Sequence, residues 1–137
     1  MVTFYFNEVK FNLPERRKLK AFIEKIFKQY GKKLGFLTYV FCSDEYLLQI
    51  NRNFLKHDYY TDIVTFNLSE TTTIIGEIYI SVDRLRDNSK QNDTTLREES
   101  HRVIFHGALH LCGLRDKSPK DKKAMTFAEN KALSQYF

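Results

Sequence analysis

Residues 95–113 read Thr-Leu-Arg-Glu-Glu-Ser-His-Arg-Val-Ile-Phe-His-Gly-Ala-Leu-His-Leu-Cys-Gly, and this stretch predicts one long helix. Thr95 and Glu98 have the spacing of a capping box, in which the Thr hydroxyl accepts from the third helical amide and the Glu reaches back to the cap. The helix is expected to run to Cys112. Gly113 follows where a glycine can end a helix in the left-handed conformation at little cost.

The chain before this helix alternates between strand and helix patterns. Residues 2–6 are typical of a short strand, and the apolar spacing from Pro14 to Gly31 predicts a helix with one broad apolar face. Residues 36–42 are rich in strand-forming side chains. Ser43 can cap a short helix that follows. Its inward side chains are expected to be Leu47, Ile50 and Phe54.

The remaining segments complete a mixed fold. Residues 61–68 and 74–81 predict an antiparallel hairpin, residues 82–88 a weak helix, and residues 118–135 a last helix that starts at Ser-Pro. The order βαβαββααα indicates an α+β or mixed α/β fold, with helices covering a sheet of about four strands. Since no repeat or linker interrupts the sequence, residues 1–137 are expected to form one domain.

Composition and charge narrow the function classes. With 42% hydrophobic and 28% charged residues, the chain resembles an ordinary globular protein, and no apolar run approaches the roughly 18 residues of a membrane span. Cys42 and Cys112 lie among apolar neighbours, and the N-terminus has no basic leader, so we expect reduced thiols and a cytoplasmic location without membrane contact. The formal charge of +5 suggests a polyanionic partner such as nucleic acid, although solvated helix faces explain the basic clusters equally well.

Two histidines in the long helix are candidate metal ligands. His106 and His110 are four residues apart, so both imidazoles can reach one ion from the same helix face. Gly113 lets the chain turn back, and Asp116 then offers an anionic oxygen. Two nitrogens, one carboxylate and a water at the fourth position form a familiar catalytic zinc set.

Two alternatives to a metal site stay open at this point. The histidines can be half-buried helix residues beside a plain glycine cap, or they can act as an acid–base pair without metal. A metalloprotease is disfavoured, because that motif needs a Glu directly after the first His and Gly107 stands there.

The same string resembles the signature of the YbeY-type rRNA maturation endoribonucleases, His-Gly-x-Leu-His-Leu-x-Gly-Tyr-Asp-His. The identical positions are His106, Gly107, Leu109, His110, Leu111 and Gly113, and apolar Leu114 stands at the Tyr position. Residues 51–66 are similar to a second block of that family, with Asn51, Asp58 and Thr61-Asp62 at matching spacing, and 76–78 resembles its Gly-Asp-Ile strand. Met125 and Glu129 fall where the last helix of the family has such residues.

The resemblance implies a zinc-dependent endoribonuclease that acts in rRNA maturation and ribosome quality control. It implies one Zn²⁺ held by His106, His110 and Asp116 with a water, and RNA as the partner, specifically rRNA of the small ribosomal subunit, with ribosomal proteins as further partners. The chain departs from the family at two places: Asp116 replaces the third metal-binding histidine, with Arg115 at the family's Asp position, and Leu55 replaces an arginine that engages the phosphate.

Because Leu55 cannot donate a hydrogen bond, another cation must offset phosphate charge in the transition state. Lys56 is the first candidate and Arg115 the second. A metal-dependent hydrolase of a non-RNA substrate, and a ribosome-assembly binding module with a structural metal, remain alternatives.

Other polar residues are expected to have structural roles. Glu99 is expected to be a solvated first-turn residue that complements the helix dipole, and His101 a packed or surface residue off the metal face. Thr61 and Asp62 are expected to begin a strand beneath the site, where a structural hydrogen-bond role and a catalytic role both stay open, and Cys112 is expected to lie in the core.

Overall fold

The computed structural model describes residues 1–137, and its elements follow the expected order. The strands are β1 (Val2–Phe6), β2 (Lys33–Cys42), β3 (Ile63–Asn67) and β4 (Thr73–Ser81). The helices are α1 (Arg16–Gln29), α2 (Asp44–Ile50), α3 (Val82–Gln91), α4 (Leu96–Leu111) and α5 (Pro119–Tyr136), and a π-helix, η1 (Asn51–Leu55), continues α2. The mixed α/β fold is therefore confirmed. None of the helices has the length and apolarity that a membrane crossing needs.

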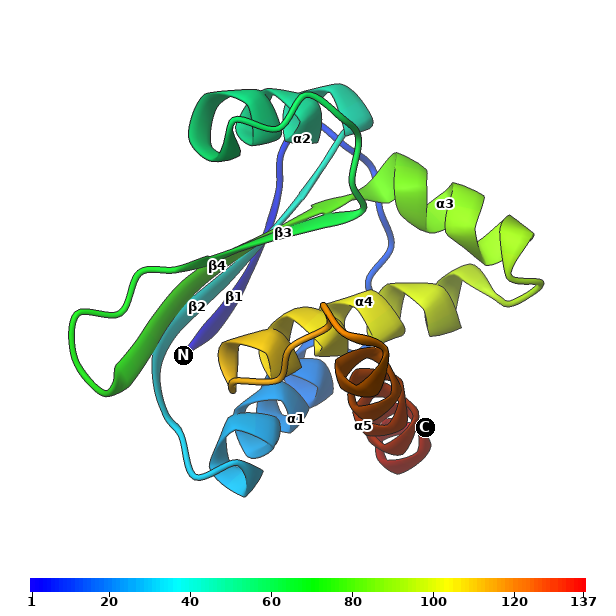
Figure 1. Ribbon diagram of the computed structural model, residues 1–137. Coiled ribbons are helices and arrows are strands. Elements are labelled where there is room, and N and C mark those ends of the chain that lie inside the picture. Colours follow the sequence, from blue (N-terminus) through cyan, green and yellow to red (C-terminus); the bar gives the residue numbers. More distant parts are fainter.

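The four strands form one sheet in the order β1-β2-β4-β3 (Figure 1). β1, β2 and β4 are parallel, and β3 runs antiparallel to β4, as predicted for the hairpin. Parallel neighbours need a crossover, which α1 supplies between β1 and β2. β1 and β3 are the two edge strands, and β3 lies beside α4.

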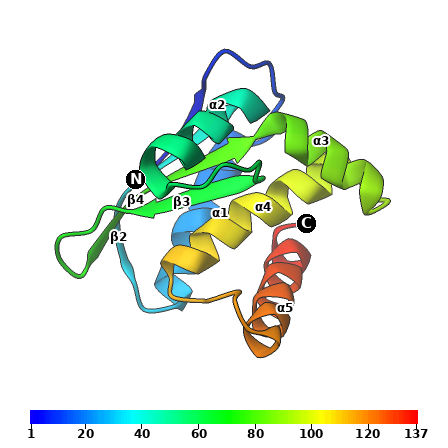
Figure 2. The same cartoon turned by 45° about the horizontal axis from the view of Figure 1, so that its top comes forward.

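Helices cover the two faces of the sheet unequally. α1 and α4 pack on one face and α5 packs against α4 (Figures 1 and 2), and their apolar side chains join those of the sheet in the main core. Tyr39 of β2 is fully buried there, and its hydroxyl donates to the Ile104 carbonyl of α4 at 2.8 Å. On the other face, α2 forms a small cluster with Cys42 and Val64.

Gly107 lets α4 contact the sheet closely. A Cβ at this position would lie 2.8 Å from Cδ1 of Ile78 in β4 and 3.1 Å from Cδ1 of Ile63 in β3. Glycine inside a helix costs about 1 kcal/mol relative to alanine, so its presence here requires a compensating contact. That contact holds the neighbouring residues of α4, His106 and His110, beside β3.

The prediction that Phe54 points inward is wrong. Phe54 is 66% exposed, and it lies in the π-helix rather than in a continuation of α2. Because π turns close from i to i+5, side chains after Ile50 are rotated away from the face that an α-helical pattern assigns to them.

Two predicted helix starts differ in detail. α1 begins at Arg16 rather than near Pro14, because Glu15 adopts the left-handed conformation with φ 51°. At the start of α4 the Thr95 side chain accepts from the Glu98 amide as predicted, but the Glu98 carboxylate accepts from Thr94 instead of the cap residue. The full capping box occurs in α5, where Ser118 and Asp121 bond reciprocally.

Replacing Gly107 with valine should lower the free energy of unfolding by about 1–3 kcal/mol, because the branched side chain overpacks the contact with Ile78. Urea denaturation of the two proteins measures the change. Ala124→Val places the same side chain at an exposed position of α5 and serves as the control. Equal stability of Gly107→Val and the control would show that α4 does not need the close contact.

Candidate metal centre

α4 brings two histidines to one hollow. His106 and His110 line a cavity of about 190 Å³ together with Asp116, and Ile63 and Thr65 of β3 complete its wall. Nε2 of His106 lies 3.5 Å from Oδ2 of Asp116. The three residues that the sequence selects as metal ligands therefore lie around one hollow.

The turn after α4 carries Asp116 to this place. Gly113 adopts φ 109°, a conformation that favours glycine, and its amide donates to the His110 carbonyl at 3.0 Å. The Leu114 amide then donates to the Leu109 carbonyl at 3.2 Å. These bonds end the helix and direct the chain back toward the histidines.

Hydrogen bonds at Nδ1 orient both imidazole rings. Nδ1 of His106 lies 2.7 Å from Oε2 of Glu129, and Nδ1 of His110 lies 3.2 Å from the Leu114 carbonyl. With the proton on Nδ1, each ring donates to its acceptor and keeps an Nε2 lone pair. Metal-binding histidines usually have such a partner on the second nitrogen.

A larger hollow of about 390 Å³ adjoins the first. Ile63, His106 and Asp116 line both, so we call the two together the histidine cleft. The other side chains of the larger hollow are Thr61, Asp62, Glu99, Arg102, Val103 and Glu129.

Carboxylates outnumber cations in the histidine cleft. Asp62, Glu99, Asp116 and Glu129 line it, whereas Arg102 is the only lysine or arginine that does. Burial raises the pKa of Asp62, and burial also raises the pKa of Glu99. Burial disfavours the charged form of these two carboxyl groups, and a bound cation would offset that cost.

His106 is the titratable group at the centre of this charge cluster. Burial lowers the pKa of His106, but the hydrogen bond to Glu129 and the charges of Glu129 and Asp116 outweigh burial, so that the pKa lies above its usual value. A proton on His106 is thus stabilised by the same carboxylates that would attract a metal ion.

Sequence reasoning missed Arg102. Its Nη1 lies 3.1 Å from Oε1 of Glu129, and its Nη2 donates to Oδ1 of Asn130 at 2.8 Å. Arg102 precedes His106 by four residues, and this helical spacing was the available signal.

Lys56 and Arg115, the cations that the sequence selected, do not line the histidine cleft. Both are exposed, Lys56 in the left-handed conformation that ends η1 and Arg115 in the turn after α4. Leu55 is half-buried and packs on the small apolar cluster of α2. The place of the family's arginine is thus taken by a packing residue.

The expectation that Glu99 is solvated is wrong. Glu99 is 5% exposed and lines the histidine cleft, because this side of α4, which also carries Arg102, lies against Asp62 and Ile63 rather than against water. His101 is packed: it is 1% exposed and stacks on Tyr136. Asn51 donates to Oγ1 of Thr61 at 2.9 Å, which agrees with a structural role for Thr61, and Cys112 is buried in the core.

The donors of the cleft fit a divalent metal by their chemistry. Two imidazole nitrogens and a carboxylate are a zinc-type set, and the charge surplus favours a cation. No group of three or more His, Cys, Asp or Glu side chains is arranged to hold an ion in this structure. Coordination of one ion by all three residues would require the side chains of His110 and Asp116 to turn toward a common point with His106.

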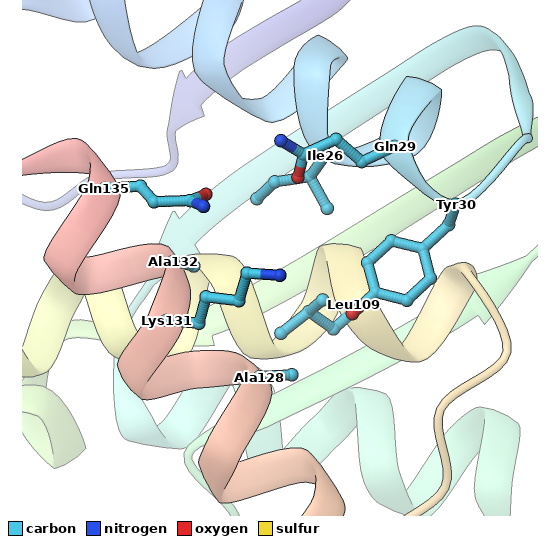
Figure 3. A pocket seen from close by; sticks show the side chains of 8 residues that line it. All are labelled: Ile26, Gln29, Tyr30, Leu109, Ala128, Lys131, Ala132 and Gln135. Carbon is cyan, nitrogen blue, oxygen red and sulfur yellow. The ribbon is translucent and has the colours of Figure 1, made fainter.

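A cavity of about 410 Å³ lies elsewhere, between α1, α4 and α5 (Figure 3). Leu109 and Ala128 form part of its wall, with Tyr30, which directly follows α1, on one side and Lys131 of α5 on the other. No histidine or carboxylate lines it. It therefore offers neither an imidazole nor a carboxylate to a metal ion.

Comparisons with known proteins agree with these features. The family model described as Endoribonuclease YbeY matches residues 4–137. A Porphyromonas gingivalis protein named Endoribonuclease YbeY is 47% identical over 96% of this chain and 87% of its own. A Bacteroides thetaiotaomicron protein of the same name is 44% identical over 97% of each chain. The solution structure of TM1509 from Thermotoga maritima superposes with a TM-score of 0.67, at 26% identity, over 99% of this chain and 89% of that one.

Replacing Glu129 with alanine should lower the free energy of unfolding by about 1.5–3 kcal/mol, because the half-buried Arg102 and His106 lose their charged partner. Thermal and urea denaturation measure this loss. Glu24→Ala removes an exposed glutamate from α1 and should change stability by no more than about 0.5 kcal/mol. If both variants were equally stable, Glu129 would not hold the two side chains.

Proposed function

This chain belongs to the YbeY family of endoribonucleases, and on that premise we propose that the histidine cleft hydrolyses RNA phosphodiester bonds with a bound divalent metal ion, for which we expect Zn²⁺. Membership confirms the resemblance and the expected enzyme class, an endonuclease that hydrolyses RNA in rRNA processing. The metal-dependent part is supported by one observation above all: two imidazoles and a carboxylate line the same hollow.

In this proposal His106, His110 and Asp116 hold the ion, and a water takes the fourth position. When bound, the ion supplies Lewis acidity, which lowers the pKa of water or polarises a phosphoryl oxygen. Glu129 holds the His106 ring in place and the Leu114 carbonyl holds that of His110. Asp116 brings a negative charge where the family signature has a neutral imidazole, so water in this site is expected to be somewhat less acidic than water beside three imidazoles.

Arg102 is our proposal for the cation that offsets phosphate charge, because it lines the cleft and keeps N–H groups for a second acceptor. Lys56 and Arg115 remain proposals for the same role. Their exposed positions suit contacts with RNA that extends beyond the cleft.

The proposed substrate is rRNA of the small ribosomal subunit, in ribosome quality control as well as maturation, with ribosomal proteins supplying specificity that a small domain lacks. The proposed location is the cytoplasm, whose reducing conditions suit the two buried free cysteines. We also propose that residues 1–137 act as one domain, which is supported by a single main core that extends from Val2 to Tyr136.

Elemental analysis of protein purified without added metal tests the proposed ligands. The unmodified protein should contain a stoichiometric transition metal, Asp116→Ala should lose it, and Asp116→His should retain it because the family has histidine there. Absence of metal from the unmodified protein and from Asp116→His alike would contradict the proposed site.

Replacing His110 with alanine should lower the rate of RNA cleavage by at least about 100-fold, because a Lewis acid worth several kcal/mol is lost. Salt-dependent RNA binding should stay intact. His57→Ala, at an exposed position outside the cleft, is the matched control. Cleavage by His110→Ala at the rate of the control would reject metal catalysis. It would favour a binding module or a hydrolase of another substrate, because Leu55 stands where the family has an arginine that engages the RNA phosphate.

A further inference from the structure

The exposed face of α5 is basic and contains no acid. Lys120, Lys122, Lys123 and Lys131 are all exposed on this helix. Its two acidic residues lie elsewhere: Asp121 is half-buried in the capping box, and Glu129 is buried against Arg102 and His106. The face therefore presents positive charge without internal neutralisation.

Phe127 stands in the middle of these lysines. It is 71% exposed, more than any other large hydrophobic residue of the chain, and it pairs with no other aromatic ring. Lys123 lies one turn before it, whereas Lys131, one turn after it, lines the cavity between α1, α4 and α5. A hollow of about 390 Å³ is bordered by Phe127 together with Lys122, Lys123, Thr126 and Asn130. Core packing does not explain a phenylalanine here, since burial of its ring would be worth about 1.5–3 kcal/mol and is not realised.

The hollow beside Phe127 is linked to the histidine cleft. Asn130 borders this hollow and accepts from Nη2 of Arg102, and Arg102 in turn lines the cleft. Figures 1 and 2 both show α5 packed against α4, the helix that carries the histidines, with the two helices crossing at an angle. An RNA strand that leaves the histidine cleft past Arg102 would thus meet Asn130 and then Phe127.

We propose that Phe127 is a stacking platform for an unpaired base of the RNA substrate outside the cleft, and that the surrounding lysines contact the adjoining phosphates. This rests on the proposed function, in which the cleft receives RNA. Every base has a π-face that can stack on an exposed aromatic ring, and lysines attract the backbone whatever its sequence. The three exposed lysines of the first turns of α5, Lys120, Lys122 and Lys123, fit a polyanion better than a neutral protein surface.

Binding of a labelled, single-stranded RNA to the full-length protein tests the platform, with chelator present and probe integrity checked on a gel. Phe127→Ala should raise Kd about 5- to 100-fold, because stacking is worth about 1–3 kcal/mol per base. Phe127→Trp should restore binding. Lys123→Gln should lower the slope of log K against log salt by about 0.7. Since Phe127 is exposed, its removal should leave the melting temperature unchanged.

Phe36→Ala is the matched control, because Phe36 is 58% exposed on β2, where the buried Leu37 next to it points to the helix-covered face. Wild-type RNA affinity in Phe127→Ala would overturn the proposal and assign this face to another partner, such as a protein. An equal loss in Phe36→Ala would also overturn it. Cleavage by His110→Ala would instead reject metal catalysis while leaving the binding result intact, so the two failures are distinguishable.

Discussion

The close contact between α4 and the sheet at Gly107 is the constraint on which the rest of the site depends. Ile78 and Ile63 occupy the space that any larger residue would need. With the helix held at this distance, His106 and His110 share the smaller hollow with Ile63 and Thr65 of β3. A helix farther from the sheet would carry the same histidines but would not enclose a cavity with them.

A buried carboxylate then joins the two helices of the site. Glu129 of α5 accepts from Nδ1 of His106 through one oxygen, and its other oxygen lies 3.1 Å from Nη1 of Arg102. Glu129 thus orients His106, a proposed metal ligand, and holds the guanidinium of Arg102 in the cleft. Because Arg102 also reaches Asn130, the same network links the histidine cleft to the exposed face of α5.

Sequence patterns within one helix and its following turn predicted the features that depend on neighbouring residues alone. The extent of α4, its glycine stop and the proximity of Asp116 to the histidines all follow from helical spacing and one turn. The orientation of Phe54 was not predicted, because it depends on a π-helix for which the sequence has no recognisable pattern. Burial of Glu99 was missed because the dipole argument considers one helix, whereas burial depends on how that helix meets β3. Arg102 has the helical spacing of a site residue, but an arginine does not bind metal ions, so the sequence did not select it. Its place in the cleft is seen only in the structure, where it lies beside Glu129.

X-ray absorption at the edge of the bound metal tests the central claim most directly, because it reports the ligands themselves. The account predicts a four-coordinate ion with nitrogen and oxygen neighbours at about 2.0–2.2 Å and the multiple scattering of two imidazoles. Conversion of Asp116 to histidine should add a third imidazole. A sulfur neighbour at about 2.3 Å, or a spectrum unchanged by that substitution, would contradict the assignment of His106, His110 and Asp116.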